Sequence, residues 1–334
     1  MQVINRRRSS GFSLVELLLA LVLGLVVVTG IVQLFVGNSR TYNVLNGQAR
    51  MQENARFALE FITQAARSTG FFGCSLDRTN YVNGLGGEWQ NIPDREWDIT
   101  QIIQADAGWV RFRSTRRPAQ RVVQVTQPDE NPTVVAPGGD PGFAVGDIVV
   151  LSSCEQGAVF RVTGMNTAGN EAELLHRPGG VCNGLGSGYT AVGNAVCVVG
   201  IEGFVPYTLS KLSRSYGADS TVAALDNTTF FVAPGADGND ALWQDVNGTA
   251  NELVSGVEDL QVLFGIDDDL GDGVTRVAQY VDFGNLPDPN DLSNVVALRI
   301  SITVNSVDEV TDDGNVLRRT YAKTIQMRNS NPEA

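Results

Sequence analysis

The sequence predicts an α+β protein: one long N-terminal α-helix packed on an antiparallel, β-rich globular head. Three observations support this class. The stretch from Phe12 to Val36 is mostly apolar and Glu16 is its only charged residue, an apolar face with helical spacing follows it, and the rest of the chain alternates in the manner of short strands. We therefore expect a helix that ends near Ser68 and a head that begins at about residue 71.

The N-terminal segment has the length and polarity of a membrane-spanning helix. At about 1.5 Å per residue, a helix from Phe12 to Val36 is roughly 37 Å long, enough to cross a bilayer with some tilt. Arg6–Arg8 precede it and predict that this end stays in the cytoplasm. Glu16 costs on the order of 3 kcal/mol in the apolar span unless it has a partner. No Lys or Arg follows until Arg40, so we expect its cationic partner to lie on another chain.

Two common kinds of N-terminal segment, a secretory signal peptide and a plain signal anchor, are alternative interpretations of this stretch. A secretory signal peptide has an apolar core of about 7–15 residues followed by a small-residue cleavage site. The core here is longer, and Val36–Arg40 offers no such site. A plain signal anchor fits the length, but it needs neither Gly11 nor Glu16.

The helical pattern continues beyond the apolar segment. Apolar residues recur at spacings of four and three residues, as on one face of a helix; they are Met51, Ala55, Ala58, Ile62 and Ala65. No proline occurs before residue 93 to force a break, and Thr69-Gly70 supplies a stop.

The head contains runs of β-type residues between clusters of Gly, Asn and Ser. Strands are predicted at residues 109–113, 121–125, 146–151, 158–162, 229–232, 241–244, 260–266, 294–304 and 319–327. We expect one β-rich unit whose two lobes meet near residue 200.

The N-terminal residues resemble a type IV prepilin leader. They combine a short basic leader that ends in Gly11, an apolar segment that starts at Phe12, and Glu16. In that family a membrane peptidase cleaves after the glycine, so the resemblance implies cleavage between Gly11 and Phe12 and N-methylation of Phe12. It also implies that Glu16 pairs with the N-terminal amine of a neighbouring subunit during assembly.

Several head motifs resemble minor pilins of the PilW kind. In chain order they are Phe71–Cys74, Ser153–Cys154, Ala158–Thr163, Thr228–Val232, Ala241–Trp243, Leu253–Val262, Val296–Ser301 and Tyr321–Ile325. The resemblance implies four segments. They are a cleaved leader (1–11), a transmembrane and filament-core helix (12–36), its amphipathic continuation (37–70) and a periplasmic or extracellular head (71–334).

The same resemblance implies a structural function, that of a minor pilin which primes pilus assembly at the inner membrane or the pilus tip. Its implied partners are prepilin peptidase, other minor pilins, the major pilin, the assembly platform, a tip adhesin and the inner membrane. We expect a single-pass inner-membrane protein with a periplasmic head, which then joins an extracellular pilus that serves twitching motility or cell adhesion. The alternatives are a type II secretion pseudopilin of the tip complex, and a pilus-borne adhesin or DNA-uptake receptor.

The charge of the chain bears on its partners. With 24 Lys and Arg against 37 Asp and Glu, the formal net charge is −13, which argues against broad binding of nucleic acid. Against this background a cluster of arginines is a candidate partner-binding surface; its members are Arg111, Arg113, Arg116, Arg117 and Arg121. A solvated strand face followed by a turn explains the same residues.

The head contains no recognisable catalytic motif. Its only histidine, His176, has no G-x-S-x-G motif to serve, so we expect no catalytic residue and no cofactor. Gly184–Gly188 lacks the consecutive Lys-Ser/Thr pair of a phosphate-binding loop.

One acidic loop is a candidate calcium site. Asp267, Asp269 and Asp272 lie within a glycine-containing turn, and carboxylate oxygens are ligands that Ca²⁺ prefers. The spacing fails the EF-hand pattern, and an Asp-Gly hairpin turn accounts for the same residues.

Four cysteines follow the apolar segment: Cys74, Cys154, Cys182 and Cys197. None has C-x-x-C spacing, which argues against zinc or a redox motif and predicts disulfides in an oxidising compartment. Four cysteines allow three pairings, which the sequence does not separate. We favour Cys74–Cys154 and Cys182–Cys197.

Overall fold

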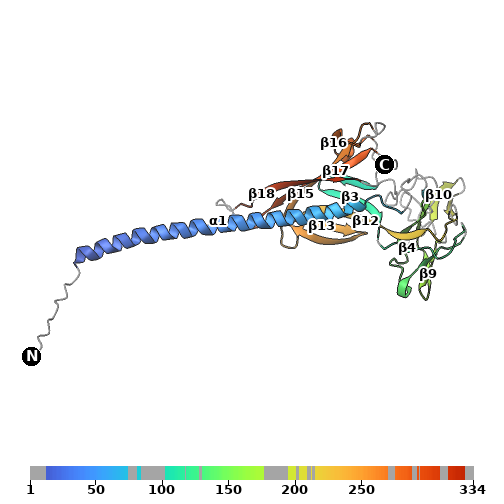
Figure 1. Cartoon of the computed structure of the whole chain (residues 1–334), viewed down its shortest axis with the longest axis horizontal. Coiled ribbons are helices and arrows are strands. Elements are labelled where there is room, and N and C mark those ends of the chain that lie inside the picture. The colour runs from blue at the N-terminus through green and yellow to red at the C-terminus, as the bar shows by residue number, and fades with distance from the viewer. Residues whose placement is uncertain are drawn as a thin grey trace, which may run out of the picture. The chain divides into compact units, whose positions relative to one another are not determined.

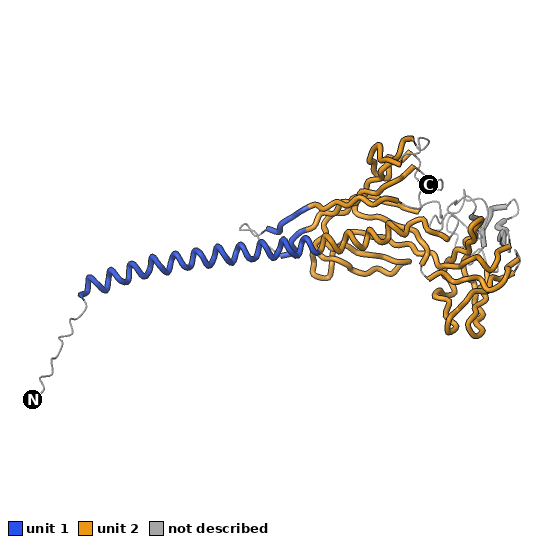
Figure 2. The backbone as a smooth tube through the Cα atoms, in the orientation of Figure 1, with its two compact units in different colours: residues 1–53, 305–319 blue, residues 54–304, 320–334 orange. Residues whose placement is uncertain are grey.

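The computed structural model describes most of the chain in separate ranges. They are residues 13–73, 81–83, 102–116, 118–127, 130–176, 195–200, 203–208, 212, 215–269, 275–287, 292, 294–308 and 315–327. Of residues 81–83, 195–200 and 203–208 only the backbone is described. The chain divides into two compact units (Figure 2): residues 1–53 with 305–319, and residues 54–304 with 320–334.

The predicted long helix is confirmed. Helix α1 runs without interruption through 55 residues, Leu14–Ser68 (Figure 1). It ends where expected, because Gly70 adopts the left-handed region with φ of 74°, a conformation open to glycine at no steric cost. The backbone N–H of Gly70 then donates to the carbonyl of Arg113 at 3.0 Å, which fixes the exit of the helix on a strand.

The largest sheet has the central order β1-β7-β6-β12-β13-β14, with β2 paired to β3, and both β3 and β4 paired to β12. Its strands are β1 (Tyr81–Asn83), β2 (Ile103–Asp106), β3 (Trp109–Thr115), β4 (Gln120–Arg121), β6 (Ile148–Ser152), β7 (Gly157–Arg161), β12 (Thr221–Pro234), β13 (Asp240–Val246) and β14 (Thr249–Ser255).

Three smaller sheets complete the described part of the head. Their orders are β16-β15-β17-β18, β5-β9-β8 and β10-β11. The strands are β5 (Thr133–Val135), β8 (Gly164–Ala168), β9 (Glu171–Leu175), β10 (Ala195–Gly200), β11 (Gly203–Thr208), β15 (Val257–Ile266), β16 (Gln279–Val281), β17 (Val295–Asn305) and β18 (Arg318–Gln326). Two short 3₁₀ helices, η4 (Pro137–Gly139) and η6 (Phe283–Asn285), lie in the connections. Together with α1 these sheets confirm the α+β class.

Strand β12 connects two regions of the second unit. Its first residues, Thr221–Ala224, pair with β4 and β6, and the longer remainder pairs with β3 and β13. An apolar cluster at the β6 end takes in residues from Val122 to Leu174 and from Leu212 to Ala224. Because that cluster draws on both sides of residue 200, the predicted lobe boundary there is wrong.

Most predicted strands are confirmed, but the one at residues 121–125 is wrong. Only Gln120 and Arg121 pair with β12. Val122 then forms an isolated bridge to Val134 and is buried, whereas Val125 is 55% exposed. The chain leaves the edge of the sheet after these two residues and turns toward β5, so the alternating pattern does not continue as a strand.

The amphipathic second half of α1 packs into the head with small side chains. Ala55, Ala58, Ile62 and Ala66 are at most 1% exposed. Ala66 replaces the predicted Ala65, which is half-buried, because the 3.6-residue period of a helix drifts from an alternation of four and three.

Polar contacts attach this half of the helix to two sheets. The side-chain amide of Asn54 donates to the carbonyl of Ser255, at the end of β14, at 3.0 Å. Lys323 on β18 donates to the Glu60 carboxylate at 3.2 Å. Within the second unit, residues 54–68 of α1 are therefore held by an apolar face flanked by polar contacts.

The first unit has its own surface contact. The guanidinium of Arg50 lies 3.2 Å from the Asp308 carboxylate, and both side chains are mostly exposed. Such a pair contributes about 0–1 kcal/mol. The N–H of Ser306 donates to the carbonyl of Leu317, which closes the segment between β17 and β18.

Truncation of the buried helix face should destabilise the head. Ile62 is fully buried, so Ile62→Ala should lower the free energy of unfolding by about 2–5 kcal/mol. Phe57 on the same helix is 51% exposed, so Phe57→Ala, the matched control, should change it by about 0.5 kcal/mol or less. Urea unfolding of the full chain in detergent measures both, and equal losses would contradict the assignment of the buried face.

The Glu60–Lys323 pair should make a small part of the stability sensitive to acid. The hydrogen bond from Lys323 lowers the pKa of the Glu60 carboxyl below its ordinary value. Its contribution is therefore present above the pKa of an unfolded glutamate, about 4.3, and is lost as the pH falls through the lower folded-state pKa. Glu60→Gln should lower Tm slightly at neutral pH at low salt, and not at a pH of about 2. An equal Tm difference at both pH values would refute this origin.

Candidate assembly site

The first part of α1 exposes a continuous apolar surface. Every large apolar side chain from Leu14 to Val36 is exposed, with Leu17 at 61% and Leu34 at 76%. The helix contains a window of 18 residues with a mean hydropathy of 2.7, and by length and composition it is able to cross a membrane. Full burial of one such side chain is worth about 1.5–3 kcal/mol, so this surface requires cover by lipid or by other apolar helices.

Glu16 is the acidic residue of the first turn of α1. Its carboxylate accepts a hydrogen bond from the backbone N–H of Ser13 at 3.4 Å, a position where negative charge also complements the helix dipole. Among the described residues Glu16 has no ion-pair partner. Its charge therefore lies at the N-terminal end of the apolar surface, within one turn of the point where the described chain begins.

The bond predicted to be cleaved lies outside the described residues, since these begin at Ser13. Cleavage between Gly11 and Phe12, methylation of Phe12 and the pairing of Glu16 thus stay predictions. What the structure places is the carboxylate three residues beyond Ser13.

The arginine cluster is not one exposed surface. Arg113 is 1% exposed and donates to the side-chain oxygen of Asn227 at 3.0 Å. Arg111 donates to the Thr229 hydroxyl at 3.0 Å. Because β3 lies inside a sheet, between β2 and β12, its arginines pair with neighbouring strands, and Arg113 is not available to another chain.

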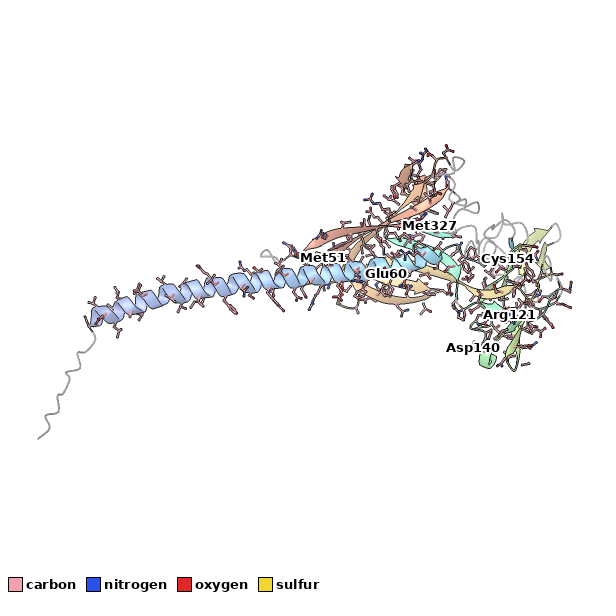
Figure 3. The ribbon with its side chains drawn as sticks, in the orientation of Figure 1. Met51, Glu60, Arg121, Asp140, Cys154 and Met327 are labelled. Carbon is pink, nitrogen blue, oxygen red and sulfur yellow. The ribbon has the colours of Figure 1, made fainter. Side chains whose placement is uncertain are left out.

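The remaining arginines have different surroundings. Arg116 makes two hydrogen bonds to the Asp226 carboxylate, at 2.8 and 3.2 Å, and the bond to Asp226 raises the pKa of Arg116 above its ordinary value. Arg121 is exposed on β4, in the same region as Asp140 and Cys154 (Figure 3). Arg117 lies outside the described residues. Of the described members, Arg121 alone is exposed rather than buried or half-buried.

The candidate calcium loop is only partly described. Asp267 is 2% exposed, and its two carboxylate oxygens accept backbone N–H groups of Asp269 and Arg276. Asp272 lies outside the described residues, among which no group of three or more His, Cys, Asp and Glu side chains is placed to hold a metal. Asp267 acts here as an organiser of the loop, and the calcium site stays a prediction.

His176 is buried and packs against neighbouring residues of the head. Its Nε2 lies 2.9 Å from the carbonyl of Glu130, and its ring packs on Phe160 with centroids 5.5 Å apart. The side chain is 5% exposed, immediately after β9. His176 is therefore a buried imidazole that packs on an aromatic ring at a strand end.

One predicted disulfide cysteine is described in full. Cys154 is disulfide-bonded. Cys74 and Cys182 lie outside the described residues, and only the backbone of Cys197 is described, within β10. Which cysteines pair stays a prediction.

Sequence reasoning missed a hollow of about 640 Å³ in the head, which Arg111, Phe231 and Asp245 help to line. Asn247 and Gly248 of the β13–β14 turn also border it, with φ of 52° and 89°. Asn-Gly with two positive φ values is the signature of a tight hairpin, so this dipeptide was the signal that could have placed the strands on either side.

Two segments of the chain match models of known protein families. The Prokaryotic N-terminal methylation motif matches residues 6–32, which contain the basic leader, Glu16 and the first turns of α1. The family Type IV Pilus-assembly protein W, PilW, matches residues 229–315, from within β12 to beyond β17. No curated protein and no solved structure matches the chain.

The PilW family consists of structural proteins and not of enzymes. The chain belongs to the PilW family of type IV pilus-assembly proteins and, with its N-terminal methylation motif, is a minor pilin.

Proposed function

We propose that this minor pilin primes pilus assembly from the inner membrane. Its apolar segment first lies in the bilayer and then packs among the helices of other pilins. The observation that carries the proposal is the exposed apolar surface from Leu14 to Val36 with Glu16 at its N-terminal end. Lipid and neighbouring helices both cover such a surface. The same segment therefore serves the membrane-bound state and the assembled state.

Glu16 supplies the specificity that an apolar surface lacks. Apolar contacts allow many axial positions between parallel helices, whereas an unpartnered carboxylate in a low-dielectric environment is costly and favours the one position that brings a cation to it. After cleavage at Gly11, the new amine of Phe12 is such a cation. A Phe12 amine of one subunit paired with Glu16 of its neighbour would set the axial register.

The head then determines which subunits meet. We propose that it lies in the periplasm while the helix spans the inner membrane once, and outside the cell in the pilus. Prepilin peptidase, the other minor pilins, the major pilin and the assembly platform are the partners. The PilW match favours the pilus over the related piston of type II secretion.

Replacement of the leader glycine should block processing. Gly11→Val puts a branched side chain at the proposed cleavage site, so the precursor should persist in the membrane with its leader attached. An immunoblot resolves precursor from mature chain. Normal processing of Gly11→Val would overturn the assignment of the site.

Removal of the Glu16 charge should separate processing from assembly. Glu16→Ala should be cleaved as in the parent but should enter sheared pili at least tenfold less efficiently, because the incoming amine has lost its partner. Glu53→Ala is the matched control: this acidic residue is also exposed on α1 but lies beyond the apolar segment. Equal incorporation of Glu16→Ala and the parent would argue against the pairing.

A further inference from the structure

We propose that the hollow beside β3, β12 and β13 binds a neutral oligosaccharide. Its volume of about 640 Å³ falls in the range of about 300–1,000 Å³ that is usual for small-molecule sites. The side chains that carry the argument are Arg111, Asp147, Asn227, Thr229, Phe231 and Asp245. All belong to the second unit.

Strand register places a polar row of side chains beside an aromatic row. Across β3, β12 and β13, Arg111 is opposite Thr229, which is opposite Asp245. Two residues along, Trp109, Phe231 and Trp243 form the next row on the same face, since side chains alternate between the faces of a strand. The opposite face carries fully buried apolar residues, so both rows lie on the face away from the core.

Phe231 is the member of the aromatic row that lines the hollow. The rings of Phe231 and Trp243 are stacked, with centroids 6.4 Å apart and planes 16° from parallel. The guanidinium of Arg111 lies 5.8 Å from the centre of the Trp109 ring. A flat ring beside hydrogen-bonding groups suits a pyranose, which has an apolar C–H face and polar hydroxyl edges.

The polar groups are held in place before any ligand arrives. Arg111 Nε donates to the Thr229 hydroxyl, Asp245 Oδ1 accepts the N–H of Gly248, and Asp147 Oδ2 accepts the N–H of Ala144. Within the described part of the chain, the terminal nitrogens of Arg111 and the second oxygens of both carboxylates have no hydrogen-bond partner. Fixed donors and acceptors of this kind lower the ordering cost of binding.

The hairpin turn at the border of the hollow is equally well fixed. The Asn247 side chain accepts the backbone N–H of Asn227 at 2.9 Å and donates to the Asp226 carboxylate at 2.8 Å. Arg116 in turn bridges Asp226 and, at 3.7 Å, Asp147. Hydrogen bonds and one ion pair therefore link the turn, Asp226 and Asp147 at the rim.

The charge of the lining disfavours an anionic ligand. Two carboxylates, Asp147 and Asp245, line the hollow against one guanidinium, Arg111, and the whole chain carries −13. An anionic ligand would be repelled. A hydroxyl both donates and accepts, so it is able to pair with the carboxylates and with the guanidinium alike.

The test uses the purified full chain in a zwitterionic detergent, because a detergent with a sugar head group would compete for the site. An array of neutral and acidic oligosaccharides identifies the probe, and the neutral oligosaccharide that binds most strongly is titrated calorimetrically. Asp245→Asn, which keeps an acceptor for Gly248, and Arg111→Met should each weaken binding at least tenfold with an unchanged Tm. Arg121→Gln, exposed on β4 outside the hollow, should bind within twofold of the parent.

Three results would overturn the proposal. One is no saturable binding of the parent chain to any neutral oligosaccharide; another is unchanged binding in Asp245→Asn. The third is binding restricted to sialylated or sulfated glycans and abolished by salt, which would assign the hollow to anions. The proposed function is tested separately, since Asp245→Asn should still be processed and enter pili.

Discussion

The constraint on which the rest depends is an apolar helix surface with one carboxylate at its N-terminal end. The side chains from Leu14 to Val36 are stable only in lipid or among other apolar helices, and Glu16 makes both environments conditional on a cation. We propose that the helices which cover this surface bring a positive charge to the height of Glu16. A fixed height for that charge is of use to a subunit that assembles in register with its neighbours.

A single helix unites the membrane function and the head. Helix α1 has no proline in its 55 residues, so nothing removes a hydrogen bond from its interior. Its second half supplies part of the core of the second unit through Ala55, Ala58 and Ile62. The small side chains allow close packing, and Asn54 and Glu60 make polar contacts with two sheets of the same unit. One helix therefore carries both the exposed apolar segment that we propose for assembly and the buried face that packs in the head.

The sequence predicted the helix and the class well because their causes are local. Apolar periodicity, the lack of proline and Gly70 determine α1 from Leu14 to Ser68, and the methylation motif is contiguous. Predictions that depended on tertiary pairing did less well. Arg113 appeared as a surface charge, but it lies on a strand between two others and is buried. The hollow near Asp245 arises from register across three strands, which no single stretch of sequence contains.

The central claim is that residues 11, 12 and 16 carry the main chemistry of this protein. Mass spectrometry of the N-terminal peptide from the mature chain, isolated from the inner membrane and from sheared pili, tests it most directly. The account predicts one species in both fractions, beginning at Phe12 with a single methyl group on its amine. An N-terminus that retains Gly11, or one that begins beyond Glu16, would contradict it.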